Sequence, residues 1–488
     1  MSSPIKFPII DYWVILPELM LLGMICFILL VDLFLPDRRR IITYFLAQVT
    51  LVGLAVFTVL NFAGVEPSKQ LNSAFVRDRL GDLLKISVYL CGVLVFWYSK
   101  QYLRSRDLFK GEYYLLGLFG VLGMMIMISS HSFLTLYLGI EVLSLSLYAM
   151  VAFQRDSAIA SEAAIKYFVL GAIASGMLLY GISMIYGATG QLEFDKVARV
   201  IATDNTSVLL GFGLVFVMVG LAFKLGAVPF HMWLPDVYHG APTSVTLYLG
   251  SLPKLAGYAI TVRLLVDALP GLMKDWQPIL IILSVLSLAI GNIVAIAQTN
   301  LKRMLAYSTI AHVGFLLLGF IAGNPNGYSA ALFYVLTYAI TAAAAFGLII
   351  LLSRRGFEAD ALEDFKGLNE RNPWFAFMVL IIVFSLAGVP PTVGFFAKWL
   401  VLKSVVDIGL TWLALVAVGF AIIGAFYYIR IVKLMYFDKP ASGVPSARLE
   451  MGKDMQWMLS INSLALLALG LYPGALISVC RMVFSLPA

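Results

Sequence analysis

Apolar runs as long as a lipid bilayer is thick recur along the whole of this chain. A helix needs about 20 consecutive apolar residues to cross the hydrocarbon core, where no water satisfies exposed backbone groups. Counting such runs predicts about fourteen transmembrane helices. We expect these helices near residues 12–35, 41–64, 82–101, 112–129, 132–153, 159–187, 207–228, 242–266, 277–297, 303–323, 327–352, 374–400, 411–436 and 455–480.

The composition agrees with a membrane protein. Only 12% of the 488 residues are charged, against about 25% in soluble domains. The first apolar run has no basic region before it and no small-residue cleavage site after it, so we expect it to be a helix of the mature protein. The predicted fold class is therefore an all-α polytopic membrane protein.

The cysteines and histidines form no recognisable ligand pattern. Cys26, Cys91 and Cys480 lie far apart in apolar runs, and the four histidines lack the paired spacing of haem sites. No glycine-rich nucleotide fingerprint follows a strand pattern. The sequence therefore predicts no metal, haem, iron–sulfur or nucleotide site in this chain.

Basic residues predict how the chain lies in the membrane. They are more frequent in the loops after odd-numbered runs, as at 38–40, 302–303 and 354–355. The positive-inside rule places these loops in the cytoplasm and both termini on the opposite side. Within the runs, Lys85 lies close enough to a helix start to extend its ammonium to the interface.

A short internal repeat divides the chain. Residues 223–229, Phe-Lys-Leu-Gly-Ala-Val-Pro, resemble residues 384–390, Phe-Ser-Leu-Ala-Gly-Val-Pro, and this match places Ser385 opposite Lys224. The copies lie five runs apart, so they cross the membrane in opposite directions, as in transporters with inverted repeats and broken helices. We predict one membrane domain, 1–488, whose parts are three N-terminal helices (1–111), two inverted five-helix repeats (112–266 and 277–436) and a C-terminal helix (455–480).

Two lysines accompany prolines near the first copy of the repeat. Lys224 precedes Pro229, and Lys254 follows Pro253, about a dozen residues from either end of its run. A lysine at membrane depth costs about 2.5–3.5 kcal/mol on insertion scales and usually faces a protein interior or a water-filled cavity. Lys254 has no acidic residue near it in sequence. An unpaired ammonium in a dry site loses its proton more readily than one in water, because burial disfavours the charged form. Lys254 is thus a candidate proton carrier.

Glu141 lies in the middle of the fifth run. It shares a helix face with Tyr137, Ser144 and Tyr148, a polar stripe on an otherwise apolar helix. A buried carboxylate needs a cation or hydrogen bonds, and we expect Lys224 to be its partner. The pair could carry protons, or it could be a static pin between two helices.

Lys398 and Lys166 are further lysines inside apolar runs. Lys398 follows the break at Pro390–Pro391, and it could instead lie at the interface if its run ends early. Glu162 precedes Lys166 by one helical turn, which predicts an ion pair. That pair fits either a structural role or a proton relay.

His312 shares a helix face with Ser308. It could be a satisfied structural residue or a proton carrier between Lys254 and Lys398. The next run carries a hydroxyl stripe that suits ordered water or helix packing, formed by Tyr334, Thr337, Tyr338 and Thr341.

The segment 224–242, Lys-Leu-Gly-Ala-Val-Pro-Phe-His-Met-Trp-Leu-Pro-Asp-Val-Tyr-His-Gly-Ala-Pro, together with Glu141 and Lys398, closely resembles the antiporter-like subunits of respiratory complex I. These subunits share their core with cation/proton antiporters. The resemblance covers nearly the whole chain. It implies a membrane subunit of the proton-pumping NADH:quinone oxidoreductase that moves protons while quinone is reduced elsewhere in the complex.

The resemblance also assigns roles, cofactors and partners. It implies a polar axis along the membrane, formed by the proton-path residues Glu141, Lys224, Lys254, Lys398, His312 and Lys166. NAD, FMN, iron–sulfur clusters and quinone would all be bound by other subunits. The expected partners are M-like and K-like membrane subunits and the lipid bilayer, with no nucleic acid. The expected location is the bacterial inner membrane.

Two other classes stay open from the sequence. One is a subunit of a cation/proton antiporter, such as a sodium/proton antiporter, which would transport ions without NADH. The other is a structural membrane subunit whose lysines have no function, which would tolerate their substitution.

Overall fold

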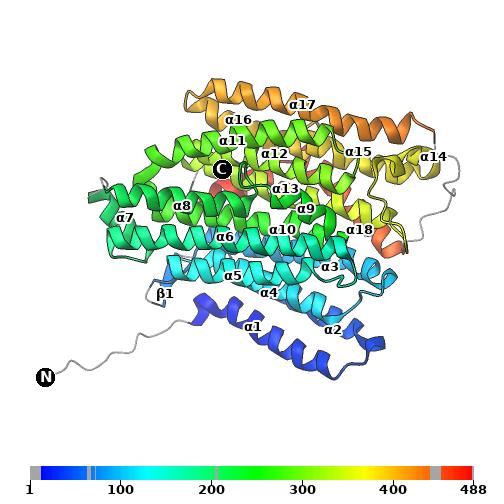
Figure 1. Ribbon diagram of the computed structural model, residues 1–488, viewed down its shortest axis with the longest axis horizontal. Coiled ribbons are helices and arrows are strands. Elements are labelled where there is room, and N and C mark those ends of the chain that lie inside the picture. Colours follow the sequence, from blue (N-terminus) through cyan, green and yellow to red (C-terminus); the bar gives the residue numbers. More distant parts are fainter. Residues whose placement is uncertain (1–11, 63–66, 72, 204–206, 440–451, 486–488) are drawn as a thin grey trace.

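Long helices lie roughly parallel to one another across the molecule (Figure 1). The computed structural model describes residues 12–62, 67–71, 73–203, 207–439 and 452–485. Helices α1 and α2 form one edge of the molecule and α17 forms the opposite edge (Figure 1). The β-strands and α7 lie at one end of the helices, and α14 lies at the other (Figure 1).

The first part of the chain contains the only two strands among the described residues, β1 (Ser68–Gln70) and β2 (Phe75–Arg77), which pair antiparallel. Its helices are α1 (Tyr12–Leu33), η1 (Asp37–Arg39), α2 (Ile41–Leu60), α3 (Arg79–Ser105), α4 (Gly111–Ser129), α5 (Phe133–Val151), α6 (Ala158–Thr189), α7 (Phe194–Thr203), α8 (Val208–Leu225), α9 (Trp233–Gly240), α10 (Thr243–Thr261) and the π-helix η2 (Val262–Ala268).

The second part follows a similar order of helices. Its elements are η3 (Pro270–Leu272), α11 (Met273–Ile296), α12 (Leu301–Ile321), α13 (Pro325–Leu352), η4 (Leu362–Phe365), α14 (Leu368–Arg371), α15 (Pro373–Ala387), α16 (Val393–Asp407), α17 (Thr411–Tyr436), α18 (Lys453–Leu471) and α19 (Gly474–Val483).

The predicted transmembrane helices are largely confirmed. In the described part of the chain, twelve helices are long and apolar enough to cross a membrane, or thirteen if α18 and α19, bent by 79°, count as one span. The predicted break in the span 374–400 is confirmed, because α15 and α16 lie on either side of residues 388–392, which include Pro390 and Pro391. Helix α10 continues through Pro253, so that proline does not end it.

Polar side chains set several of the helix starts. Asn300 and Asn324 accept hydrogen bonds from backbone N–H groups of the first turns of α12 and α13, and Asp78 does the same for α3. These N–H groups have no partner within the helix. Pro325, in the first turn of α13, costs nothing because its missing N–H would be unsatisfied there anyway.

Three helices form the centre of the molecule. The most apolar windows of α10, α12 and α13 are 89%, 94% and 89% buried, whereas those of α1, α6 and α17 are 39%, 39% and 33% buried. A helix buried on every side within the chain cannot place a charged side chain in lipid or in water. Lys254 on α10 and His312 on α12 therefore depend on neighbouring helices for their polar contacts.

Candidate functional site

The first helix break lies between α8 and α9. Helix α8 ends at Leu225, and Gly226 follows with φ of 81°, a left-handed conformation that glycine adopts without steric cost. The ammonium of Lys254, on α10, donates a hydrogen bond of 2.9 Å to the Leu225 carbonyl oxygen. Carbonyls at a helix end lack partners within the helix and form its negative pole. Lys254, 4% exposed, thus holds its charge on a helix end rather than on an acid.

The predicted contact between Glu141 and Lys224 is wrong for this structure. No ion pair within 4.0 Å joins them among the described residues, and the Lys224 ammonium donates to Ser144 Oγ at 2.6 Å. Ser144 lies one turn after Glu141 on α5, so Lys224 and Glu141 lie near each other without direct contact. The buried Glu141 Oε1 has no hydrogen-bond partner in the described part of the chain. The ammonium thus lies on the Ser144 hydroxyl, one turn along α5 from the Glu141 carboxylate.

The second helix break lies between α15 and α16. The Lys398 ammonium, on α16, donates hydrogen bonds of 3.1 Å and 2.8 Å to the carbonyls of Leu386 and Ala387, the last residues of α15. Helix α16 continues to Asp407, so Lys398 lies within a helix and not at its end. Like Lys254, it neutralises the negative end of a broken helix.

The ends of α8 and α15 align the two breaks one residue differently from the match in sequence. Gly388, with φ of 82°, caps α15 as Gly226 caps α8. Aligning these two glycines places Leu386, not Ser385, opposite Lys224. The match in sequence placed Gly226 opposite an alanine, because a match over seven residues cannot show which residue takes the left-handed conformation.

His312 lies among tyrosines at the centre of the second half. Its Nδ1 lies 2.6 Å from the Tyr334 hydroxyl and its Nε2 lies 3.3 Å from the Tyr428 hydroxyl. The ring also packs on Tyr338, with 4.8 Å between centroids. Both ring nitrogens thus face hydroxyl groups that can give or take a proton.

A small cavity, lined in part by polar side chains, lies between His312 and Lys398. Its volume is about 10 Å³, close to the space that one water molecule needs. The predicted hydroxyl stripe lines it. The lining residues are His312, Tyr334, Thr337, Tyr338, Thr341, Ser385, Leu386, Gly394, Ala397 and Lys398.

Lys166 lies apart from these buried groups. Its side chain is 43% exposed and forms ion pairs with Glu162, at 2.9 Å as predicted, and with Asp236, at 2.8 Å. Asp236 also pairs with Arg303 at 2.9 Å. Burial raises the pKa of Asp236, but the hydrogen bonds from Lys166 and Arg303 outweigh that effect and leave the pKa below its usual value.

Two buried lysines have a different environment from the one predicted. Lys85 does not extend to the interface, because it is 1% exposed and forms an ion pair of 2.7 Å with Glu18 of α1. Lys302, which the sequence places in a basic loop, is 4% exposed and donates to the Ala241 carbonyl at 2.8 Å. The acidic Glu18 within the first apolar run was the available signal for the Lys85 pair.

The fold, the two broken helices and their lysines define an antiporter-like membrane subunit. A model of the family described as NADH:quinone oxidoreductase/Mrp antiporter, TM, matches residues 130–424. The match begins before α5 and ends within α17. It thus contains every predicted proton-path residue, from Glu141 to Lys398.

Comparison with related proteins identifies the branch of this family to which the chain belongs. The chain is 63% identical over 481 residues to NADH-quinone oxidoreductase subunit N of Thioalkalivibrio sulfidiphilus (strain HL-EbGR7), covering 98% of this chain and 99% of that one. The chain belongs to the family of NADH-quinone oxidoreductase subunit N.

Solved structures show the same architecture. A chain of respiratory complex I from Thermus thermophilus with bound aureothin superposes with a TM-score of 0.81 at 29% identity, covering 94% of this chain and 98% of that one. A chain of the Mrp complex from Dietzia sp. DQ12-45-1b has a TM-score of 0.84 at 21% identity, covering 96% of each chain. The Mrp chain shares the fold.

Metal ligands do not gather in the part of the chain that the structure describes. No group of three or more His, Cys, Asp or Glu side chains there could hold a metal ion. The candidate site consists of lysines, hydroxyl groups, His312, Glu141 and backbone carbonyls.

Proposed function

We propose that this chain is the proton-translocating subunit N of an NADH:quinone oxidoreductase and that it moves protons through its buried lysines. The observation that carries this proposal is the pair of ammonium groups at the helix breaks. Lys254 and Lys398 each donate to carbonyls at the end of a broken helix. Such a contact stabilises the charged lysine without a fixed counter-ion, so the proton can leave without separating an ion pair.

The geometry supports a path with a movable first step. Lys224 rests on Ser144, and the Glu141 carboxylate on the same helix has a free oxygen. Movement of Lys224 from the hydroxyl to the carboxylate would change the charge that Lys254 experiences. A hydrogen bond to a charged group contributes about 1.5–3 kcal/mol, which compares with about 2.3 kcal/mol for one charge crossing 100 mV.

Beyond Lys254, the path continues through His312 to Lys398. The tyrosine hydroxyls on both ring nitrogens of His312 and the water-sized cavity beside Lys398 support this segment. Lys166 and its ion pairs with Glu162 and Asp236 are partly exposed, which suits an entry region better than the buried axis.

The domain limits and the orientation belong to the same proposal. Helices α4–α10 and α11–α17 each contain one broken span in the same place of the order, which supports inverted repeats over 112–266 and 277–436. The basic loops support a cytoplasmic location for the starts of α10 and α12, and periplasmic termini in a bacterial inner membrane. The terminal residues themselves lie outside the described part of the chain.

The redox groups belong elsewhere in this proposal. NADH, FMN, iron–sulfur clusters and quinone would bind other subunits of the complex, and this chain would neighbour M-like and K-like membrane subunits. The fold shared with the Mrp complex keeps a sodium/proton antiporter subunit as the second candidate.

Native gel electrophoresis of mildly solubilised membranes separates the two candidates. A subunit of the oxidoreductase migrates in a large band that oxidises NADH, whereas an antiporter subunit migrates apart from that activity. Proton pumping per NADH oxidised then tests the path in membrane vesicles. We expect Lys254→Ala to lower this ratio strongly and Lys433→Ala, at an exposed position of α17, to leave it unchanged. Unimpaired pumping by assembled Lys254→Ala complex would refute the path.

A further inference from the structure

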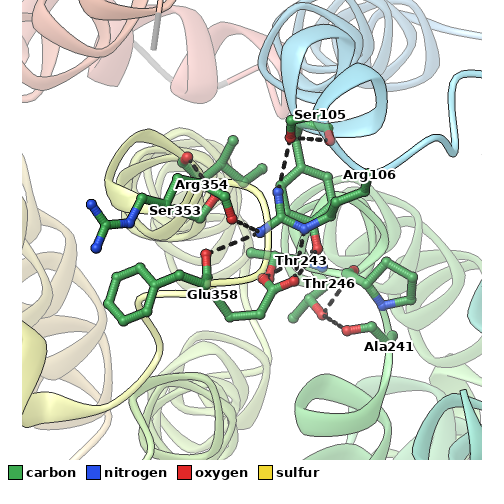
Figure 2. Close-up of polar contacts among 12 residues, drawn as sticks. Ser105, Arg106, Ala241, Thr243, Thr246, Ser353, Arg354 and Glu358 are labelled. Carbon is green, nitrogen blue, oxygen red and sulfur yellow. Dashed lines mark hydrogen bonds and ion pairs between the residues drawn. The ribbon is translucent and has the colours of Figure 1, made fainter. Parts of the chain in front are cut away.

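A cluster of hydrogen bonds joins three segments that lie far apart in the sequence. The Glu358 carboxylate accepts from Arg106 Nε at 2.9 Å, from the Tyr102 hydroxyl at 2.9 Å and from Thr243 Oγ1 at 3.0 Å. Tyr102 and Arg106 lie at the end of α3, Thr243 begins α10, and Glu358 lies in the loop after α13. Figure 2 shows Arg106 reaching between Thr243 and the loop that carries Arg354 and Glu358. We call Tyr102, Arg106, Thr243 and Glu358 the clasp.

The clasp holds the first residue of α10 by both its backbone and its side chain. The Thr243 N–H donates to the Tyr102 hydroxyl at 3.0 Å, in addition to the side-chain contact with Glu358. This N–H is one of those that a helix start leaves without a partner. The Arg106 guanidinium lies 3.9 Å from the Tyr102 ring centroid and so fixes the ring that fixes α10.

The start of α12 is tied to the same place. Lys302 donates to the Ala241 carbonyl at 2.8 Å, two residues before α10 begins at Thr243. The Leu301 N–H donates to the carbonyl of Asp360 at 2.6 Å, two residues after Glu358 in the same loop. Helices α10 and α12 therefore begin against the same loop.

These two starts set the depth of the two central proton-path residues. Lys254 lies as many residues after the start of α10, at Thr243, as His312 lies after the start of α12, at Leu301. Each is about three helical turns from its start at a rise of about 1.5 Å per residue. A common anchor at the starts thus places both side chains at a matched depth.

We propose that the clasp is a positioning device for the proton path, with Glu358 as its central residue. It fixes α10 along its own axis, and so holds Lys254 on the Leu225 carbonyl and level with His312. The Lys254 contact is 2.9 Å long, and such hydrogen bonds extend to about 3.2 Å, so a small axial shift of α10 weakens it. Glu358 acts through Lys254, because its carboxylate accepts hydrogen bonds from Arg106, Tyr102 and Thr243. This inference rests on the proposed function.

The inference also explains part of the motif that links α9 to α10. In the sequence Gly-Ala-Pro-Thr at 240–243, the Ala241 carbonyl accepts a hydrogen bond from Lys302, and Thr243 donates both of its clasp hydrogen bonds, to Tyr102 and Glu358. The proton-path residues alone account for neither contact. The motif is thus one of the parts of the first half of the chain that contact this loop, together with the end of α3.

Proton pumping per NADH oxidised, in vesicles normalised for assembled complex, tests the clasp. We expect Glu358→Ala to lower this ratio about three-fold or more, the scale of mutations that alter coupling between sites. Glu358→Gln keeps an acceptor for Arg106 and the hydroxyls, so it should recover most of the ratio. If Glu358→Ala prevents assembly, Tyr102→Phe removes only the hydroxyl that bonds Glu358 and Thr243, and it should lower the ratio in the same direction.

Asp107→Asn is the matched control. Asp107 pairs with Arg355 at 3.0 Å and joins the same two segments, but both side chains are about 80% exposed, and in the described part of the chain neither forms an ion pair with α10. The control should pump normally. A normal ratio in both Glu358→Ala and Tyr102→Phe overturns the clasp, and equal losses in Glu358→Ala and Glu358→Gln show a charge or proton role instead. Normal pumping by Lys254→Ala in the same assay would refute the proposed path, not the clasp alone.

Discussion

The two helix breaks use the same chemistry with different connections. At the first break the lysine comes from another helix, because Lys254 of α10 reaches the end of α8. At the second break Lys398 lies on α16 and reaches back to the end of α15, the other half of the same broken span. The first break also carries an additional lysine, Lys224, in the last turn of α8.

This difference separates two ways of controlling a buried lysine. The contact of Lys398 depends on the short turn at 388–392, which connects α15 with α16. The contact of Lys254 depends on how α8 and α10 pack, so it changes whenever one helix moves relative to the other. We infer that helix movement acts on the first break and that the second responds through the path.

The largest effects should come from removing the lysines. Lys254→Met and Lys398→Met keep most of the side-chain length but remove the donor, so we expect proton pumping to fall to background in both. A buried carbonyl left without a partner costs about 1–3 kcal/mol. Lys398→Met leaves two carbonyls without this donor and should lower the thermal stability of the complex more than Lys254→Met does, as measured by thermal unfolding. Equal thermal stabilities of the Lys254→Met and Lys398→Met complexes would contradict the proposed difference between the two breaks.

Adding a methyl group at the capping glycines should separate the breaks next. An L-residue in the left-handed conformation costs about 1–2 kcal/mol, so Gly226→Ala and Gly388→Ala should both reduce thermal stability. The new Cβ at Gly388 would lie 2.8 Å from Cδ of Lys398, whereas at Gly226 it would meet Leu234 at 2.5 Å. We therefore expect the larger loss of pumping per assembled complex in Gly388→Ala, and the opposite order would contradict this account.

Ser144→Ala should have a moderate effect confined to the first break. It removes the hydroxyl that accepts from Lys224 at 2.6 Å, and one such bond contributes about 0.5–1.5 kcal/mol. Pumping should slow because Lys224 loses its resting position. Ser146→Ala is the control, since the Ser146 hydroxyl donates only to the Val142 carbonyl of its own helix. Vesicle pumping assays on both variants would show whether the resting position matters.

The smallest effect should come from Asp236→Asn. Ion pairs with Lys166 and Arg303 hold the pKa of Asp236 below its usual value despite its partial burial. A lowered pKa contributes stability above the unfolded value of about 3.9, and this contribution is lost as the pH falls through the folded pKa. The variant should therefore unfold slightly earlier than the parent at pH 7, and the gap should narrow below about pH 4. If the stability difference between the parent and Asp236→Asn grows as the pH falls below about 4, the ion pairs do not stabilise the fold through the charged carboxylate.

Much of the site follows from local signals. Apolar length predicts the spans, and the prolines at 229 and 390–391 predict the breaks, because both act on a few neighbouring residues. The rarity of charge in such spans identifies Lys224, Lys254 and Lys398 as residues that need an explanation. The i, i+4 pair of Glu162 and Lys166 needs only helix geometry.

The contacts of these residues were beyond local signals. Nothing in the sequence shows that Lys224 reaches Ser144 and not Glu141, or that Tyr428 of α17 lies beside His312. The acceptors of Lys254 and Lys398 are backbone carbonyls. Every residue has one, so the residue types in the sequence do not show which carbonyl accepts the hydrogen bond.

The sequence by itself determined a chain of membrane-spanning helices with charged residues at two breaks, because bilayer thickness and backbone hydrogen bonding act on each segment separately. Only the tertiary structure decided which carbonyl, hydroxyl or carboxylate each ammonium meets. That choice depends on which faces of which helices pack together and at what depth, and a shift of a single helical turn, about 5.4 Å, would change every partner.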